Sequence, residues 1–164
     1  MQKNSLMELN EVYFWTATIY NWNHLLHGED FKNIIIHSLE FLSTKNKIAV
    51  YGFVIMPNHV HIIWEMLDMN GKEKSYASFL KYTAHKFLEH LRNINPTLLE
   101  KYLVDEATRL HRFWQRDPLA IRITSREMLQ QKLNYCHNNP LQEHWNLATE
   151  PEAYYYSSAF DYRN

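Results

Sequence analysis

The chain has 164 residues, a length that predicts a single domain covering residues 1–164. Its 17 basic and 18 acidic residues leave a net charge of −1, which excludes a strong overall positive field of the kind that attracts nucleic acid. Apolar residues make up 46%, which excludes wholesale disorder, and no signal peptide or membrane-length apolar run is visible, so we expect no membrane partner.

The first half of the chain predicts three strands and one helix. The aromatic and β-branched residues 12–19 predict a strand, and after a polar loop, apolar residues at helical spacing predict a helix over 31–43. A nearly continuous apolar run predicts a central strand at 48–56. The alternating residues 59–66 predict its antiparallel neighbour, because only the turn Pro57-Asn58 separates the two.

The next part of the chain predicts a second helix and a fourth strand. A polar loop over 68–74 leads into a helix over 75–92. The connection through residues 93–105 contains a proline and is expected to hold a single helical turn. The fourth strand is predicted at 110–115.

The last predicted helix has clear start and stop signals. Thr124-Ser-Arg-Glu127 is a capping box, in which the threonine hydroxyl and the glutamate carboxylate satisfy the first free amides. Pro140 ends this helix, and the aromatic tail around Tyr154-Tyr-Tyr156 is expected to pack against the domain. The element order β-α-β-β-α-β-α predicts an α+β fold of the split βαβ type, an antiparallel sheet with helices on one face.

The sequence His59-Val60-His61 lies on a predicted strand. Because alternate residues of a strand share a face, the two imidazoles project side by side while Val60 points the other way. This arrangement suits a divalent metal ion, for which neutral imidazole is a common ligand. Two half-exposed histidines on a sheet face would explain the pattern without any metal.

Tyr135 and Asn139 are four residues apart on the last predicted helix, so they are neighbours on one of its faces. They lie to one side of the apolar stripe of that helix, together with Lys132. A tyrosine at the rim and an asparagine that caps the helix end would explain this pair without any chemistry.

Taken together, these residues suggest a metal-assisted site. His59, His61 and the amide oxygen of Asn139 provide a mixed nitrogen and oxygen ligand set, and Tyr135 lies one helical turn from it. A phenol has a pKa near 10, so neighbouring positive charge from the metal and from Lys132 would raise the phenolate fraction. Such a tyrosine is a nucleophile for a polarised phosphorus atom.

Two segments of the sequence resemble a known family. Met56-Pro-Asn-His-Val-His-Ile-Ile63 resembles the His-hydrophobe-His signature of HUH-superfamily tyrosine transposases. Leu133-Asn-Tyr-Cys-His-Asn-Asn-Pro140 resembles their nucleophile helix, especially in the REP-associated tyrosine transposases and the insertion-sequence-200-like transposases. Phe113-Trp-Gln115 and Tyr154-Tyr-Tyr-Ser-Ser158 are also similar to segments of that family. The resemblance covers Val12 to Tyr162, which indicates a domain core over residues 12–162.

The resemblance implies a ferredoxin-like fold with a C-terminal helix that carries the nucleophilic tyrosine. It implies a Mg²⁺- or Mn²⁺-dependent transposase that nicks and rejoins single-stranded DNA near hairpins. By position, Tyr135 would be the nucleophile and His59, His61 and Asn139 the metal ligands, although some relatives have Gln at the third ligand position. Tyr135 would form a 5′-phosphotyrosine link and release a 3′-hydroxyl. Relatives act as dimers that exchange the tyrosine helix or as monomers, so a homodimer and a monomer both remain open.

Basic side chains on the predicted second helix, near the fourth strand and on the tyrosine helix are candidates for DNA binding. They are Lys81, Lys86, Arg109, Arg112, Arg116, Arg122 and Lys132. A solvated surface charge would explain any single one of them.

Two other functions fit the sequence. A catalytically silent relative would bind hairpin DNA or RNA on its sheet, although the complete set of two histidines, tyrosine and asparagine argues against it. An unrelated metal hydrolase would instead activate water and would turn over without Tyr135.

Four further residues are rivals or candidates for supporting roles at this site. Tyr82, with Lys86 one turn away, is a rival nucleophile that nothing ties to the metal ligands. Glu65 shares the histidine face and is a candidate to support the ligands. His137 points about 200° away from Tyr135 on an ideal helix, which favours a packing role. Cys136, the one cysteine of the chain, cannot form an internal disulfide, which favours a core position and a cytoplasmic setting.

Overall fold

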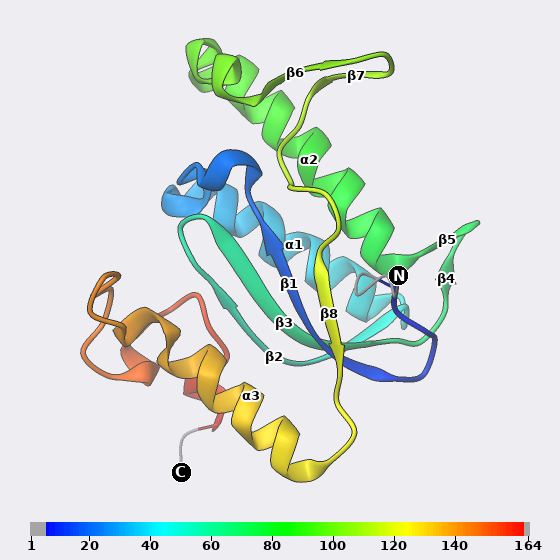
Figure 1. Cartoon of the computed structure of the whole chain (residues 1–164), viewed down its shortest axis with the longest axis vertical. Helices are drawn as coiled ribbons and strands as arrows, with labels where there is room; N and C mark the ends of the chain where they lie inside the picture. The colour runs from blue at the N-terminus through cyan, green and yellow to red at the C-terminus, as the bar shows by residue number, and fades with distance from the viewer. Residues whose placement is uncertain (1–5, 163–164) are drawn as a thin grey trace.

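The computed structural model describes residues 6–162, so the first five and last two residues of the predicted domain lie outside the described part. Its centre is a four-stranded antiparallel sheet in the order β2-β3-β1-β8 (Figure 1). The strands are β1 (Val12–Thr18), β2 (Ile48–Ile55), β3 (His59–Met66) and β8 (Leu119–Arg122). Strand β3 lies between β1 and β2 and is antiparallel to both, which is the predicted split βαβ, ferredoxin-like topology.

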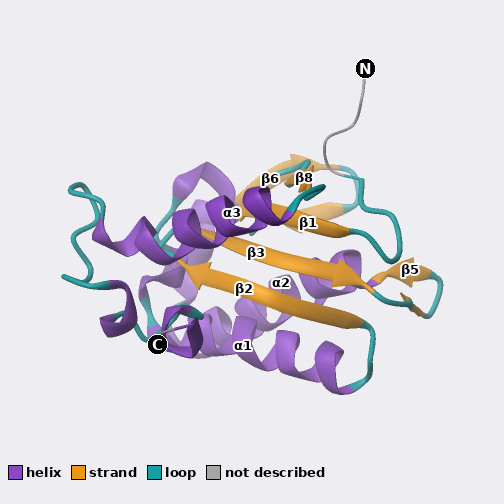
Figure 2. Ribbon diagram, turned by 90° about the horizontal axis from the view of Figure 1, so that it is seen from below, coloured by secondary structure: helices purple, strands orange, loops and turns teal. Residues whose placement is uncertain are grey.

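The helices cover both faces of this sheet, whereas the element order predicted helices on one face only. Helices α1 (Glu29–Thr44) and α2 (Ser75–Ile94) pack together on one face, and α3 (Arg126–Asn138) lies across the other (Figure 2). The alternation of β1 and β3 explains this division. Trp15 and Trp64 point toward α1 and α2, whereas Phe14 and Ile63 belong to a second core with residues of α3. The histidine face of β3 is therefore the face that α3 covers.

The fourth strand differs from its prediction. Residues 110–115 are not a strand of the main sheet; β8, at Leu119–Arg122, occupies the place beside β1. Trp114 forms a single bridge to Ile19 at the end of β1. Asp117, with a left-handed backbone (φ 54°), and Pro118 then turn the chain so that the next residues pair with β1. The apolar pattern of 110–115 thus reflects side chains packed in the core at the end of the sheet, and not a strand hydrogen-bonded along β1.

Two short hairpins occur in regions predicted as loops. Strands β6 (Leu103–Glu106) and β7 (Arg109–His111) form an arm that projects beyond the sheet next to the end of α2 (Figure 1). Strands β4 (Met69–Asn70) and β5 (Glu73–Lys74) form a smaller hairpin around Gly71, which has a positive φ of 67°. Short 3₁₀ helices complete residues 6–162, namely η1 (Tyr20–Trp22), η2 (Leu25–His27), η3 (Pro96–Tyr102), η4 (Asn139–Leu141), η5 (Pro151–Ala153) and η6 (Ala159–Tyr162).

The cap of α3 lies one residue later than predicted. The Ser125 side chain accepts a hydrogen bond from the Met128 amide at 3.1 Å, so Ser125 is the N-cap and Thr124 is not. The third residue of the helix is then Met128, which has no carboxylate to complete a capping box. Two adjacent hydroxyl residues compete for the cap, and the extended backbone of Ser125 decides between them.

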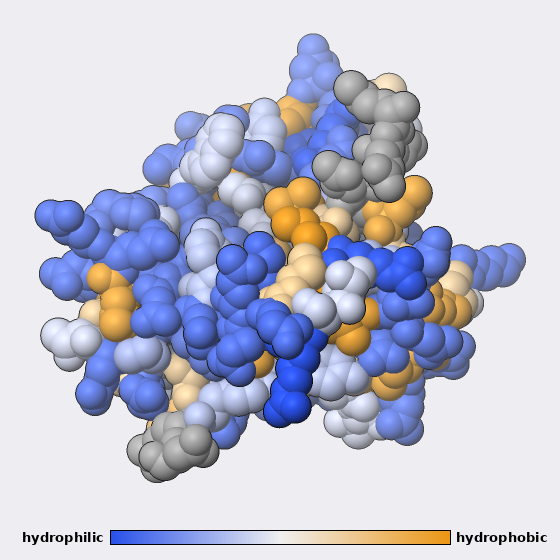
Figure 3. All heavy atoms as spheres, turned by 60° about the horizontal axis from the view of Figure 1, so that its bottom comes forward, coloured by the Kyte–Doolittle hydropathy of each residue, from blue (hydrophilic) through white to orange (hydrophobic). Residues whose placement is uncertain are grey.

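The aromatic tail packs against the outer edge of the sheet, as predicted. The Ile55 amide donates to the Tyr156 carbonyl at 2.9 Å, and the Ser158 amide donates to the Phe53 carbonyl at 3.0 Å. The tail therefore pairs with β2, whose open edge would otherwise expose unpaired backbone groups. On the face shown in Figure 3 the surface is mostly hydrophilic, with apolar residues in small separate groups. Between residues 6 and 162, no helix combines the length and the apolar character needed to cross a membrane.

Candidate active site

The two histidines of the predicted motif lie at the beginning of β3 and point to the face covered by α3. Their rings are 4.7 Å apart between centroids and meet edge to face. The β1–β3 register places Thr18 opposite His59 and Thr16 opposite His61. The sheet thus holds both imidazoles next to β1, below the C-terminal part of α3.

Each histidine is oriented by a hydrogen bond at Nδ1. His59 Nδ1 lies 2.6 Å from the Asn58 side-chain oxygen, and His61 Nδ1 lies 2.8 Å from the Thr16 hydroxyl. The Asn58 oxygen accepts only, so the His59 proton is on Nδ1 and its lone pair is on Nε2. Partners of this kind fix the tautomer and the ring plane of a metal-binding histidine. Sequence reasoning did not identify Thr16 or Asn58, although the strand register would have indicated Thr16.

Both imidazoles are held in the neutral state. Burial, and then the nearby His144, lower the pKa of His59 to about 4. Burial, and then the charges of His59 and Lys132, lower the pKa of His61 to about 3. Desolvation disfavours the charged form of a base, so both rings are neutral near pH 7 and have a lone pair to donate.

Tyr135 reaches the same place from α3. Its ring centroid is 5.3 Å from that of His61, and the side chain is 46% exposed. Leu133 and Cys136 on the same helix are buried against the sheet, which turns Tyr135 to the rim of the helix. Phe14 packs between these groups, with its ring stacked on His61 and its edge toward Tyr135. The phenol is therefore accessible beside the histidines.

Asn139 follows α3 as the first residue of η4 and is 2% exposed. Within residues 6–162, its side-chain oxygen is one of three buried polar side-chain atoms that have no hydrogen-bond partner. The other two are the indole nitrogens of Trp15 and Trp64, in the core on the opposite face of the sheet. A buried acceptor without a partner costs about 1–3 kcal/mol. Because Asn139 also lines a pocket, its oxygen is a candidate ligand atom.

A pocket of about 280 Å³ brings His59, Tyr135 and Asn139 together, and the ring of His61 lies next to that of His59. It is lined by Thr18, Trp22, Asn58, His59, Tyr135, Asn139, Gln142, His144 and Trp145. The ring of Trp145 lies 6.0 Å from that of His59 and also contacts His144. Sequence reasoning missed the segment that follows Pro140, although the adjacent rings of His144 and Trp145 shortly after the helix end could have indicated it.

The residues present fit a divalent ion. In the described chain, no cluster of three or more His, Cys, Asp or Glu side chains could hold a metal, so a purely His and carboxylate site is absent there. The candidate donors are instead two neutral imidazoles, whose rings lie 4.7 Å apart, and the unpartnered oxygen of Asn139, which lines the same pocket as His59. This set leaves further positions for phosphate or water oxygens. The imidazoles suit a divalent transition ion, and the amide oxygen with further phosphate or water oxygens suits Mn²⁺ or Mg²⁺.

The predicted DNA-binding cations lie in several places, and most have a carboxylate partner. Lys81 pairs with Glu73, Lys86 with Glu89, Arg122 with Glu11, and both Arg112 and Arg116 with Glu106. Lys132 lies near the site, with its ammonium 4.9 Å from the centroid of Phe14. The structure thus brings Lys132, and none of the others, next to the histidines and Tyr135.

The rival and supporting candidates from the sequence lie away from the pocket. Tyr82 is on α2, on the opposite side of the sheet, where Lys86 covers its ring. Glu65 is at the far end of the histidine face and accepts a hydrogen bond from Tyr51 at 2.8 Å. His137 is buried and bonded to Ser158 at 2.9 Å, which is a packing role. Cys136 is a core residue, and burial raises the pKa of its thiol to about 12.

Comparison with known proteins supports the fold of this site. A solved structure described as a REP-associated tyrosine transposase bound to a REP hairpin superposes with a TM-score of 0.68. The match covers 98% of this chain and 84% of that chain, at 14% sequence identity. No protein-family model matches the chain, and no curated protein matches it. The likeness shows that the two chains share a fold, which confirms the resemblance indicated by the motifs at that level.

Proposed function

We propose that this chain is a metal-dependent single-stranded DNA endonuclease and strand transferase that cuts near hairpins through a phosphotyrosine intermediate. The observation that carries the proposal is the convergence of an exposed tyrosine, two neutral histidines and an unpartnered buried amide oxygen. These groups lie on the fold of a protein that was solved with a hairpin. Helix α3 packs on the sheet that carries both histidines.

His59, His61 and Asn139 would hold Mg²⁺ or Mn²⁺. What the bound ion supplies is Lewis-acid polarisation of the scissile phosphate. Asn58 and Thr16 keep the two imidazoles in orientation, and Trp145 covers the side of His59. Lys132, close to Phe14 and His61, adds positive charge where negative charge develops during attack.

The phenolic oxygen of Tyr135 is the nucleophile. It forms a bond to the phosphorus of the scissile phosphate, while the bond between that phosphorus and the 3′ oxygen of the preceding nucleotide breaks. The phosphate stays on the 5′ oxygen of the following nucleotide. The phenolic proton goes to solvent, and the leaving oxygen takes up a proton to become a 3′-hydroxyl. The phosphodiester bond is conserved as a phosphotyrosine ester, so attack by another 3′-hydroxyl rejoins DNA without ATP.

Covalent trapping tests this proposal. Labelled DNA hairpins with single-stranded flanks are incubated with Mn²⁺ and separated on a denaturing gel. We expect a protein–DNA band that disappears in Tyr135→Phe and in a His59→Gln/His61→Gln variant. Tyr82→Phe is the matched control, because it removes an exposed phenol on the opposite side of the sheet.

The other outcomes separate the competing functions. Cleaved DNA without a covalent band, undiminished in Tyr135→Phe, would show that water is the nucleophile and that the site is a hydrolase. Retention of the hairpin with neither cleavage nor a covalent band would favour a catalytically silent binding module.

A further inference from the structure

A second hollow lies on the other side of the molecule from α3. It is a groove of about 600 Å³ between helix α2 and the segment from the β6–β7 arm to the start of β8. On α2 it is lined by Ala77, Leu80, Lys81, Ala84, His85, Leu88 and Arg92, which repeat at helical spacing and so form one face. The opposite wall is residues 108–118.

The charges that face this groove are mostly positive. The cations are Lys81, Arg92, Arg109 and Arg112, and the one carboxylate in the lining is Asp117. Outside the lining, Glu73 is paired with Lys81, and Glu106 is paired with Arg112 and Arg116. No ion pair joins Arg92 or Arg109 to any carboxylate within residues 6–162.

Arg92 and Arg109 stand on the two opposite walls, one on the last turn of α2 and one on β7. Both are exposed, and the positive charge of Arg92, after burial, lowers the pKa of His111 on the arm. From Lys81 to Arg92 the helix rises about 16 Å, which is roughly five phosphate steps along one strand of duplex DNA. The floor between them is apolar, formed by Leu80, Ala84 and Leu88.

The groove adjoins the candidate active site. The Gln115 amide, in the groove wall, donates to the Thr18 carbonyl at 2.8 Å, and Thr18 also lines the catalytic pocket. Trp114 bridges Ile19 next to it. The lining of the groove and the lining of the pocket are thus joined at the end of β1.

We propose that this groove binds the phosphate backbone of the DNA hairpin, with Arg92 and Arg109 as the principal contacts. The inference rests on the proposed DNA-cutting function and adds the surface that holds the substrate. A positive channel with two unpaired guanidinium groups on facing walls fits a polyanion, because each phosphate neutralised releases counterions.

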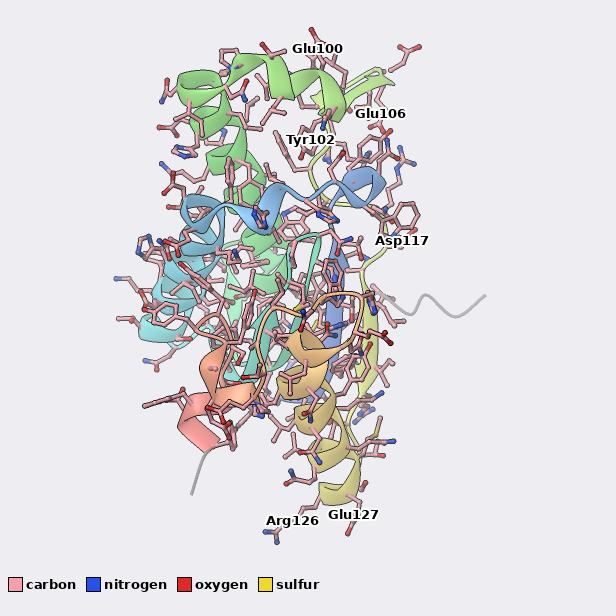
Figure 4. All side chains as sticks on the ribbon, turned by 90° about the vertical axis from the view of Figure 1, so that its left-hand side faces the viewer. Glu100, Tyr102, Glu106, Asp117, Arg126 and Glu127 are labelled. Atoms are coloured by element: carbon pink, nitrogen blue, oxygen red, sulfur yellow. The ribbon has the colours of Figure 1, made fainter. Side chains whose placement is uncertain are left out.

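Hairpin binding without cleavage tests the proposal. In a Tyr135→Phe background, the affinity for a labelled DNA hairpin with single-stranded flanks is measured at several salt concentrations. We expect Arg92→Gln/Arg109→Gln to weaken binding by roughly tenfold or more and to lower the salt slope by about 1 for each phosphate that is no longer neutralised. The matched control is Lys45→Gln/Arg126→Gln, which removes the same charge away from the groove; Figure 4 shows Arg126 at the opposite end of the molecule from Glu106 of the arm.

Each alternative result has a defined meaning. Equal affinity of the groove variant and the control would overturn the groove assignment and leave the proposed chemistry standing. If the protein with unchanged groove residues binds no hairpin at low salt, the groove is not a DNA-binding site. Tighter binding of an RNA hairpin, abolished in the same variant, would replace DNA by RNA as the partner. The protein that retains Tyr135 could bind the hairpin through the groove and yet give no covalent band. That result would support the groove as the DNA-binding site and refute the proposed cleavage.

Discussion

Asn139 provides the sharpest residue-scale test, because its oxygen is buried without a partner when no metal is present. We expect Asn139→Leu to change the free energy of unfolding by less than about 1 kcal/mol without metal, since an apolar group of similar shape removes an unsatisfied acceptor. The same variant should lose the rise in melting temperature that Mn²⁺ gives the original protein, because one ligand is missing. Thermal unfolding with EDTA and with Mn²⁺ measures both effects. An unchanged Mn²⁺ effect would remove Asn139 from the ligand set.

The neutral histidines predict how stability depends on pH. In the folded chain the pKa is about 4 for His59 and about 3 for His61, whereas both are 6.5 in the unfolded chain. Below pH 6.5 the unfolded chain therefore binds more protons, and stability is lost as the pH falls toward 4. Each histidine contributes a loss of about 1.4 kcal/mol per pH unit in that window.

Urea unfolding in EDTA at several pH values measures this slope. His59→Gln/His61→Gln should show a shallower fall in stability, since neither glutamine titrates. Parallel slopes for the two proteins would mean that these rings are not kept neutral by burial. Because the other histidines are common to both proteins, the difference isolates the two site residues.

At the scale of elements, the position of α3 depends on Gly52 of β2. A Cβ atom at this residue would overlap the Cδ2 atom of Leu133, so the glycine allows the tyrosine helix to approach the sheet closely. We expect Gly52→Ala to destabilise the protein by about 1–3 kcal/mol and to lower the yield of covalent adduct more than the affinity for DNA. Leu133→Val removes the overlapping atom.

A double-mutant cycle tests this steric account. The combined Gly52→Ala/Leu133→Val variant should be less destabilised than the sum of the two single variants, and urea unfolding measures each free energy. Simple additivity would show that the two residues do not compete for the same space.

The tail fixes α3 and β2 to each other through Ser158. Its hydroxyl accepts from the Phe53 amide at 2.9 Å and is bonded to His137 on α3 at 2.9 Å. We expect Ser158→Ala to cost about 1–3 kcal/mol, because a buried amide and a buried imidazole lose their partner. Ser157→Ala is the matched control, since the Ser157 hydroxyl bonds only within the tail among the described contacts. Equal losses in the two variants, measured by urea unfolding, would contradict a clamp at Ser158.

The sequence predicted the parts of this fold that depend on local pattern. The alternation of residues 59–66 correctly divided the faces of β3, which is why two histidines were expected side by side. The fourth strand was misplaced, because a stretch of buried aromatics at the sheet end looks like a strand, and the short β8 is defined by its pairing with β1. The hydrogen bonds of Thr16 and Asn58 to the two histidines depend on the strand register and on side-chain rotamers. Neither can be derived from a pattern in the sequence.

At the scale of the whole molecule, the two sides of the sheet have different tasks. Helices α3 and α2 lie on opposite sides of the sheet (Figures 1 and 2). The candidate active site is on the α3 side, and the positive groove is on the α2 side, which the arm extends. The two meet at the end of β1, where Thr18 is joined to Gln115. The strands of the arm pair with each other in a separate two-stranded sheet, so the proposed DNA contact there can be altered without disturbing the four-stranded sheet.

Excision of the arm tests this division. Residues 103–111 can be replaced by an Asn-Gly turn, because the Arg112 amide already donates to the Tyr102 carbonyl at 2.8 Å. The stacked pair of Tyr102 and Phe113 remains to hold the junction. We expect the excised protein to keep its cooperative unfolding and its Mn²⁺-dependent rise in melting temperature, since neither the sheet nor the pocket is touched.

Its affinity for DNA hairpins should fall by roughly tenfold or more, because the groove loses residues 108–111 of one wall, among them Arg109. The excised segment carries Asp105, Glu106 and Arg109, so its removal changes the net charge from −1 to 0 and leaves the molecule less negative. Binding governed by overall charge would therefore become tighter, whereas binding in the groove becomes weaker. The sign of the change in affinity, measured by titration of a labelled hairpin, decides between the two.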